Sequence, residues 1–167
     1  MVLRVPPSGY FIPLGFAGPV FQRQNPDAAQ VVGAGTSVVV LAKTVPCPAG
    51  AALCIMAEAH GQNQEPEAGA GNFTITVRVT PQTVPPTPPI LLDIATDVLV
   101  GPAQTGEMGI DTAYVPADIA DDDDVLVELV VTATSEAFDV GTRPAGGCSL
   151  LIVTCDRSAF EFVIATP

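Results

Sequence analysis

The feature that most constrains this fold is a series of short runs rich in valine, isoleucine and threonine, separated by turn-forming residues. In the clearest run, Asn72–Thr80, apolar side chains occupy every second position from Phe73 to Val79. A period of two residues is that of a half-buried β-strand. No segment sustains the apolar period of an amphipathic helix over several turns. The pattern therefore predicts a chain built from strands, without a long helix.

Eight such runs alternate with clusters of proline, glycine, aspartate and asparagine. They are Thr36–Val45, Ala51–His60, Asn72–Thr80, Ile90–Val100, Met108–Val115, Asp124–Thr134, Cys148–Cys155 and Ala159–Thr166. Short strands with polar or proline-rich breaks are typical of an all-β sandwich or barrel. A chain of 167 residues is the size of one domain.

Four cysteines form two pairs with the same spacing, Cys47 with Cys54 and Cys148 with Cys155. Seven residues of one strand span roughly 23 Å, far more than the 7 Å or so between the Cα atoms of a disulfide. Pairing across the two segments fits better, because the antiparallel register that sets Cys47 opposite Cys155 also sets Cys54 opposite Cys148. The odd spacing puts these pairs on opposite faces, so at most one has good disulfide geometry. The alternative is four reduced cysteines acting as small buried apolar residues.

The same two segments point to a strand order. If the eight runs follow the order of a jelly roll, Ala51–His60 and Cys148–Cys155 are antiparallel neighbours, as the cysteine register requires. The first run then pairs with the last. We therefore predict an all-β fold, a single eight-stranded antiparallel jelly-roll sandwich over residues 35–167, preceded by an extended arm over residues 1–34.

The expected arm differs from the rest of the chain in composition and charge. Its prolines interrupt every apolar stretch before a helix or a membrane span can form. Residues 1–45 carry three basic residues and one acid, whereas residues 46–167 carry three basic residues and 17 acids. The arm has too much apolar surface to remain in water, so its own domain, a neighbouring subunit or a partner must cover it. The residues expected at this interface are Tyr10, Phe11, Ile12, Leu14, Phe16, Val20, Phe21 and Arg23.

Charge and composition exclude several functions. With a net charge of −12 the chain lacks the basic surface that nucleic acids and anionic membranes require. Its one histidine, His60, has no sequence signature of a catalytic partner. Zinc does not fit either, because the cysteines of each pair are too far apart for a structural site. We expect no enzyme activity and no cofactor.

The run Asp121, Asp122, Asp123, Asp124 is the strongest polar feature. Adjacent carboxylates can gather Ca²⁺, but four neighbours in a row cannot all face one ion, and the alternating pattern of a calcium loop is absent. The other interpretation is a solvated turn before a strand, where charge also discourages edge-to-edge aggregation. We therefore expect no metal site. If the chain does bind calcium, this run of aspartates is the weak candidate for the site.

The chain resembles jelly-roll structural proteins of tailed bacteriophages in several features. These are the proline-rich arm, the near absence of lysine, the sequence Val115–Asp121 and the strand Val125–Leu129 that follows it. The likeness extends over residues 36–166 without a diagnostic motif, so it assigns no functional residue. It implies a capsid decoration (cement) protein or head-fibre base, often a homotrimer, on the capsid surface after assembly in the host cytoplasm. The partner would be the major capsid protein or another virion protein.

The alternative function is a receptor- or glycan-binding fibre or tail module, in which binding can depend on calcium. In that case the site would lie at Tyr114 and the aspartates of residues 121–124.

Overall fold

The computed structural model describes residues 19–23, 30–64, 69–83, 88–117, 123–141 and 147–157. This part of the chain contains ten strands and no α-helix. The strands are β1 (Val20–Arg23), β2 (Gln30–Val32), β3 (Ser37–Cys47), β4 (Ala51–Asn63), β5 (Gly71–Pro81), β6 (Ile90–Val100), β7 (Thr105–Tyr114), β8 (Asp123–Ala133), β9 (Phe138–Val140) and β10 (Ser149–Asp156). None of the described residues belongs to a helix long and apolar enough to cross a membrane.

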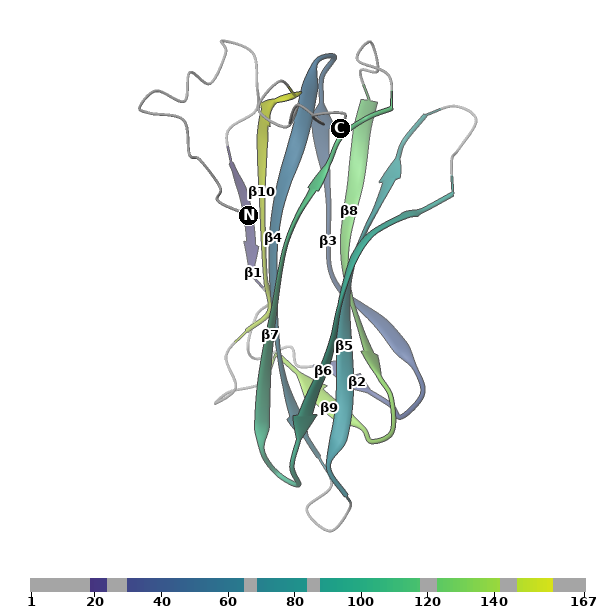
Figure 1. The fold of residues 1–167 in the computed structure, drawn as a ribbon, viewed down its shortest axis with the longest axis vertical. Helices are drawn as coiled ribbons and strands as arrows, with labels where there is room; N and C mark the ends of the chain where they lie inside the picture. The colour runs from purple at the N-terminus through teal and green to yellow at the C-terminus, as the bar shows by residue number, and fades with distance from the viewer. Residues whose placement is uncertain are drawn as a thin grey trace, which may run out of the picture.

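The strands form two antiparallel sheets that face each other as a sandwich (Figure 1). The larger sheet is organised around β4, which pairs with β7 along one edge and with β10 and then β9 along the other. Two short strands complete it, β1 beside β10 and β2 beside β9. The smaller sheet has the order β3-β8-β5-β6.

The core lies between the two sheets and follows from the alternation of each strand. In β5 every second residue is buried, from Gly71 to Pro81. β8, β4 and β10 alternate in the same way, so one face of each sheet is apolar and covered by the other. The largest fully buried side chains are Phe73, Phe138, Leu53, Ile55, Ile75, Leu129, Leu150 and Ile152.

The predicted all-β antiparallel sandwich is confirmed. Each of the first seven predicted runs corresponds to a strand, and Ile90–Val100 matches β6 at both ends. The eighth run, Ala159–Thr166, lies outside the described residues, as does its expected pairing with the first run. Within the described part, β3 pairs with β8.

Two short strands lie inside the segment that was expected to form an arm. β1 pairs with β10 and β2 with β9, so residues 20–23 and 30–32 belong to the larger sheet of the same chain. The expected interface residues from Tyr10 to Phe16 lie outside the described residues. The strand β1 thus pairs with its own domain, which covers Val20 but leaves Phe21 exposed.

The cysteine-bearing strands β4 and β10 are antiparallel neighbours, as predicted, but the predicted register is wrong. Cys155 faces Ala52 rather than Cys47, and Cys54 does not face Cys148. Cys47 is in fact the last residue of β3 in the smaller sheet, because the chain turns towards the larger sheet before β4 begins.

The register also depends on an interruption between β9 and β10. Both strands lie along the same edge of β4, and β9 pairs Gly61 with Val140. If the chain continued in that register, residue 143 would face Glu58, but Ser149 occupies this place instead. Gly141, the first residue after β9, has a φ of 80°, which is the left-handed conformation that glycine adopts at little cost. Sequence spacing gives no direct sign of such an interruption.

Candidate functional site

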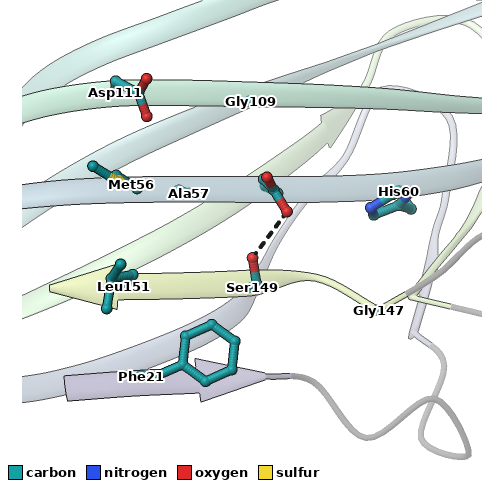
Figure 2. Close-up of a pocket in the computed structure, with 10 residues that line it drawn as sticks. Phe21, Met56, Ala57, His60, Gly109, Asp111, Gly147, Ser149 and Leu151 are labelled. Atoms are coloured by element: carbon teal, nitrogen blue, oxygen red, sulfur yellow. Dashed lines mark hydrogen bonds between the residues drawn. The ribbon is translucent and has the colours of Figure 1, made fainter. Parts of the chain in front are cut away.

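The outer face of the larger sheet carries a row of side chains that crosses four strands. In this row Phe21 of β1 faces Leu151 of β10, Leu151 faces Met56 of β4, and Met56 faces Asp111 of β7. Figure 2 shows these residues along the same side of the sheet. The row results from antiparallel pairing, because directly opposed residues point to the same face.

The row is unusually apolar for a face turned to solvent. The side chains of Phe21 and Met56 are 63% and 50% exposed, while Leu151 is half-buried between them. The residues that alternate with them, Ile55, Ala57, Leu150 and Ile152, are buried in the core. An exposed contiguous apolar surface on a soluble domain indicates a contact surface for another molecule.

The face is hollowed into an open groove of about 770 Å³. Its apolar side is formed by the row, and its polar side by Glu58, His60, Asp111 and Ser149. The Ser149 hydroxyl donates a hydrogen bond of 3.2 Å to the Glu58 carboxylate (Figure 2). No lysine or arginine is among the described residues that line the groove, so its polar rim presents carboxylates.

His60 is located inside β4, although its position before Gly61 suggested the end of a strand. Its Nδ1 atom is 3.9 Å from Oε2 of Glu107, the residue opposite it on β7. This is an ion pair only when the imidazole is protonated.

A second hollow, of about 620 Å³, lies where β6 begins and β7 ends. Tyr114 and Asp123 both line it, together with Ile90 and Leu92. Tyr114 is only 8% exposed, because it terminates β7 with its side chain against the core. The glycan-binding alternative named Tyr114 together with the aspartates of residues 121–124, and the structure brings Tyr114 and Asp123 to the same hollow, although Tyr114 is largely buried.

The structure places only part of the aspartate run. Asp123 and Asp124 are the first residues of β8 and face Cys47 and Pro46 of β3. Asp121 and Asp122 lie outside the described residues. Within the described ranges, no three histidine, cysteine, aspartate or glutamate side chains gather as a metal-binding group.

The expected interface residues are likewise only partly described. Val20 packs against the core, whereas Phe21 is exposed. Arg23 ends β1 opposite Ser149, and its side chain is not described.

Two cysteines approach each other on the outer face of the larger sheet. The sulfur atoms of Cys54 and Cys155 lie 3.4 Å apart as separate thiols. Cys155 also donates to the carbonyl oxygen of Ala52, at 3.4 Å. Burial, and then the neighbouring Cys54, raises the pKa of the Cys155 thiol to about 12. Cys148 is buried in the core, and burial raises its pKa to about 11.

The groove residues Met56, Glu58, Asp111, Ser149 and Leu151 were not predicted from the sequence. The signal that was present is the outward position of Met56, Glu58 and His60 in the alternating pattern of β4. The missing information was the register, which alone determines that Leu151 and Asp111 lie beside Met56.

Comparisons with known proteins concern the fold. No family model and no curated protein matches the chain. Among solved structures, T=1 particles derived from infectious bursal virus match with a TM-score of 0.58 at 9% identity, over 84% of this chain and 32% of that chain. The VP2 subviral particle of infectious bursal disease virus matches with a TM-score of 0.52 at 8% identity, over 84% and 33%. The chain thus spans about a third of the length of these viral proteins, and it has the jelly-roll fold of a part of them.

Proposed function

We propose that the chain is a non-enzymatic structural protein of a virion, which decorates the capsid surface as a cement subunit. The observation that carries this proposal is the exposed apolar row on the outer face of the larger sheet, centred on Phe21 and Met56. A cement protein needs such a surface, because it acts by covering the junctions of other subunits. The jelly-roll fold shared with part of viral particle proteins supports the same role.

The sequence of the arm supports a docking role for the same part of the chain. β1, which carries Phe21, begins at Val20, four positions after the last of the apolar residues between Tyr10 and Phe16. The arm and the row are therefore adjacent along the chain, and one partner surface can cover both.

The more specific parts of the proposal come from the resemblance to structural proteins of tailed bacteriophages. On this basis the protein is a homotrimer on a phage head, and its partner is the major capsid protein or another virion protein. Assembly takes place in the host cytoplasm.

A binding experiment with heads that lack this protein tests the role. Heads of the virus that encodes the chain are mixed with the full chain, with a version lacking residues 1–18, and with the double variant Phe21→Ser/Met56→Ser. The truncation stops before β1, so the sheet stays complete. Sedimentation measures bound protein, and native mass spectrometry measures the oligomeric state.

We expect the full chain to bind and to form trimers, and both altered proteins to lose at least about tenfold in affinity, which corresponds to roughly 1.4 kcal/mol. Leu91→Ser is the matched control, because Leu91 is 55% exposed but belongs to β6 of the other sheet. The proposal fails if the full chain does not bind heads, or if the double variant binds and assembles like the full chain.

The groove also favours a second candidate function, the recognition of a glycan. Carboxylates accept hydrogen bonds from sugar hydroxyls, and Glu58 and Asp111 line the same groove as the exposed ring of Phe21. A glycan array with the full chain, with and without Ca²⁺, separates the two roles. A cement protein binds no sugar, whereas a fibre or tail module gives a signal that Glu58→Gln and Asp111→Asn remove.

A further inference from the structure

Cys54 and Cys155 are diagonal neighbours on the ladder between β4 and β10. Cys54 faces Val153 and Cys155 faces Ala52, so the two cysteines are offset by one outward-facing position. Both point to the outer face, and their sulfur atoms are 3.4 Å apart. A disulfide bond is about 2.05 Å long, and diagonal neighbours are spaced about 7–8 Å apart, so joining the two sulfur atoms requires the side chains to turn towards each other and the two strands to move closer.

The two thiols differ in how a reagent can reach them. Cys54 lines a surface hollow of about 330 Å³ together with Met56, Asp111 and Ala113. A small molecule can therefore contact its sulfur from solvent. Cys155 donates to the carbonyl oxygen of Ala52, and its raised pKa of about 12 leaves very little of it as thiolate at neutral pH. The geometry thus favours Cys54 as the first thiol to react.

We propose that Cys54 and Cys155 form a redox site that closes to an intramolecular disulfide when a low-molecular-weight disulfide oxidises it. The Cys54 sulfur, having lost its proton to water, attacks one sulfur of the small disulfide. A mixed disulfide forms, and the first small thiolate leaves and takes up a proton. Cys155 then loses its proton and attacks the Cys54 sulfur, and the second small thiol leaves. Two protein thiols are oxidised, and one small disulfide is reduced to two thiols.

The bond would join strands that are far apart in the chain, because the two cysteines are separated by 101 positions. A crosslink over such a loop restricts the unfolded chain strongly, and it holds β10 on β4 beneath the exposed row. The site itself does not depend on a virion role. Its benefit rests on the proposed function, because thiols kept reduced in the cytoplasm would become oxidised once particles are released.

The test uses the full chain, purified with reductant and then incubated at neutral pH with oxidised glutathione. Digestion with pepsin at low pH stops thiol exchange, and mass spectrometry identifies the linked peptides. We expect one dominant crosslink, between Cys54 and Cys155, and a melting temperature at least about 5 °C higher than that of the reduced chain. Cys54→Ser and Cys155→Ser should each lose both the crosslink and the increase.

Cys47→Ala/Cys148→Ala is the matched control, because it keeps the proposed pair and removes the other two cysteines. If this variant does not fold, the peptide map of the unaltered chain still decides. Dominant crosslinks through Cys47 or Cys148, disulfide-linked dimers, or glutathione that remains attached to Cys54 would each overturn the proposal. Because the isolated chain is used, failure here is independent of the binding experiment with heads.

Discussion

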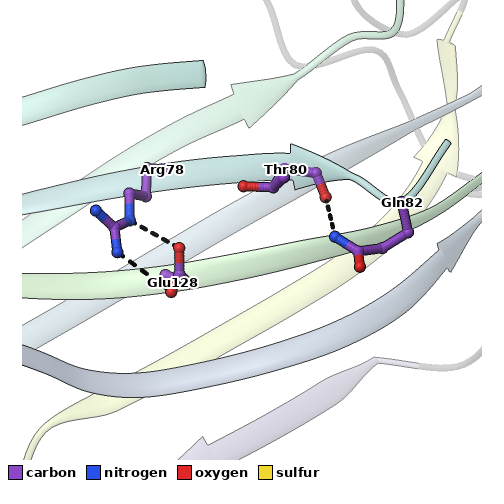
Figure 3. Close-up of polar contacts among 4 residues, drawn as sticks. All are labelled: Arg78, Thr80, Gln82 and Glu128. Atoms are coloured by element: carbon purple, nitrogen blue, oxygen red, sulfur yellow. Dashed lines mark hydrogen bonds and ion pairs between the residues drawn. The ribbon is translucent and has the colours of Figure 1, made fainter. Parts of the chain in front are cut away.

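The guanidinium group of Arg78 in β5 donates hydrogen bonds of 2.7 and 3.3 Å to the two carboxylate oxygens of Glu128, its direct neighbour in β8 (Figure 3). The pair lies on the outer face of the smaller sheet, and the Glu128 side chain is only 13% exposed. Charge-assisted pairs in this two-point geometry are among the stronger polar contacts of a protein surface. The pair therefore connects the two central strands of this sheet.

We predict that Arg78→Met lowers the free energy of unfolding by about 1–2 kcal/mol, because it leaves a largely buried carboxylate without its partner. A double-mutant cycle with Glu128→Gln, measured by urea unfolding, should give a coupling energy of about 0.5–1 kcal/mol that decreases at high salt. Lys43→Met is the control, since it removes an exposed cation from β3. A coupling energy of zero would mean that the pair does not stabilise the sheet.

A second prediction concerns two glycines close together in the chain, Gly69 and Gly71. A Cβ atom on Gly71 would lie 2.7 Å from Cβ of Glu136 and 3.1 Å from Cζ of Phe138, whereas nothing lies within 4 Å of one on Gly69. Phe138 has little freedom to move, because its ring packs on that of Phe73 with centroids 5.2 Å apart. We expect Gly71→Ala to cost about 1–3 kcal/mol and Gly69→Ala to stay within about 0.5 kcal/mol of the unaltered chain.

Thermal and urea unfolding of both variants measure this difference. Equal free energies of unfolding for Gly71→Ala and Gly69→Ala would show that the segment carrying Glu136 moves away from the new methyl group at no measurable cost.

The strand pattern was the most predictable part of this fold. β5 was predicted to within one residue at each end, because one face of it is buried and the other is partly exposed along its whole length. β1, β2 and β9 were missed, since three or four residues are too few to show a period. Such strands form because a longer neighbour offers an edge, which is a tertiary effect.

The groove was less predictable than the strands. Its row brings together Phe21, Met56 and Leu151, which are distant in sequence, and their meeting depends on the register of β4 with β10. β10 does not continue the register in which β9 pairs with β4. The predicted cysteine pairs were wrong although the predicted strand neighbours were right, because Cys47 belongs to β3 and the register of β4 with β10 sets Cys54 opposite Val153.

A third prediction uses Asn63 at the end of β4, which is 1% exposed. Its amide nitrogen donates to the carbonyl oxygens of Val100 and Gly69, at 3.2 and 3.3 Å. In Asn63→Asp a carboxylate faces these two oxygens, so the pKa of the introduced carboxyl should rise above its ordinary value of about 3.9. When the pKa of a group is higher in the folded state than in the unfolded state, the protonated group favours folding at a pH below the unfolded-state pKa. This contribution to the free energy of unfolding is lost as the pH rises through the folded-state pKa.

We therefore expect Asn63→Asp to lose at least about 2 kcal/mol at pH 7 relative to the unaltered chain, and to recover part of it near pH 4. Urea unfolding between pH 4 and pH 8 measures the difference. Asn63→Ala is the control, because it loses the same hydrogen bonds without gaining a titrating group. If the unfolding free energies of both variants depend on pH in the same way, the contacts that the Asn63 amide donates do not determine the loss of stability in Asn63→Asp.

The last prediction concerns the alkaline limit of stability. Cys148 lies in the core just before β10, and burial raises the pKa of its thiol from 9.0 to about 11, although a hydrogen bond from the His60 backbone partly offsets the increase. Between these two values the folded chain keeps a proton that the unfolded chain has lost. The folded state is thus favoured below pH 9, and this contribution disappears as the pH rises to about 11. Two pKa units correspond to about 2–3 kcal/mol.

We expect the free energy of unfolding to fall over this range more steeply in the unaltered chain than in Cys148→Ala. The measurement is urea unfolding with reductant present, from pH 8 to pH 11. The quantity compared is the slope of the unfolding free energy against pH. The absolute free energies are not compared, because the substitution also removes core volume. Leu150→Ala is the matched control, because it removes buried side-chain volume from β10 without removing a titrating group. Equal slopes for the unaltered chain and Cys148→Ala would show that this thiol ionises in the folded state as easily as in the unfolded state, and that water reaches the core beside β10.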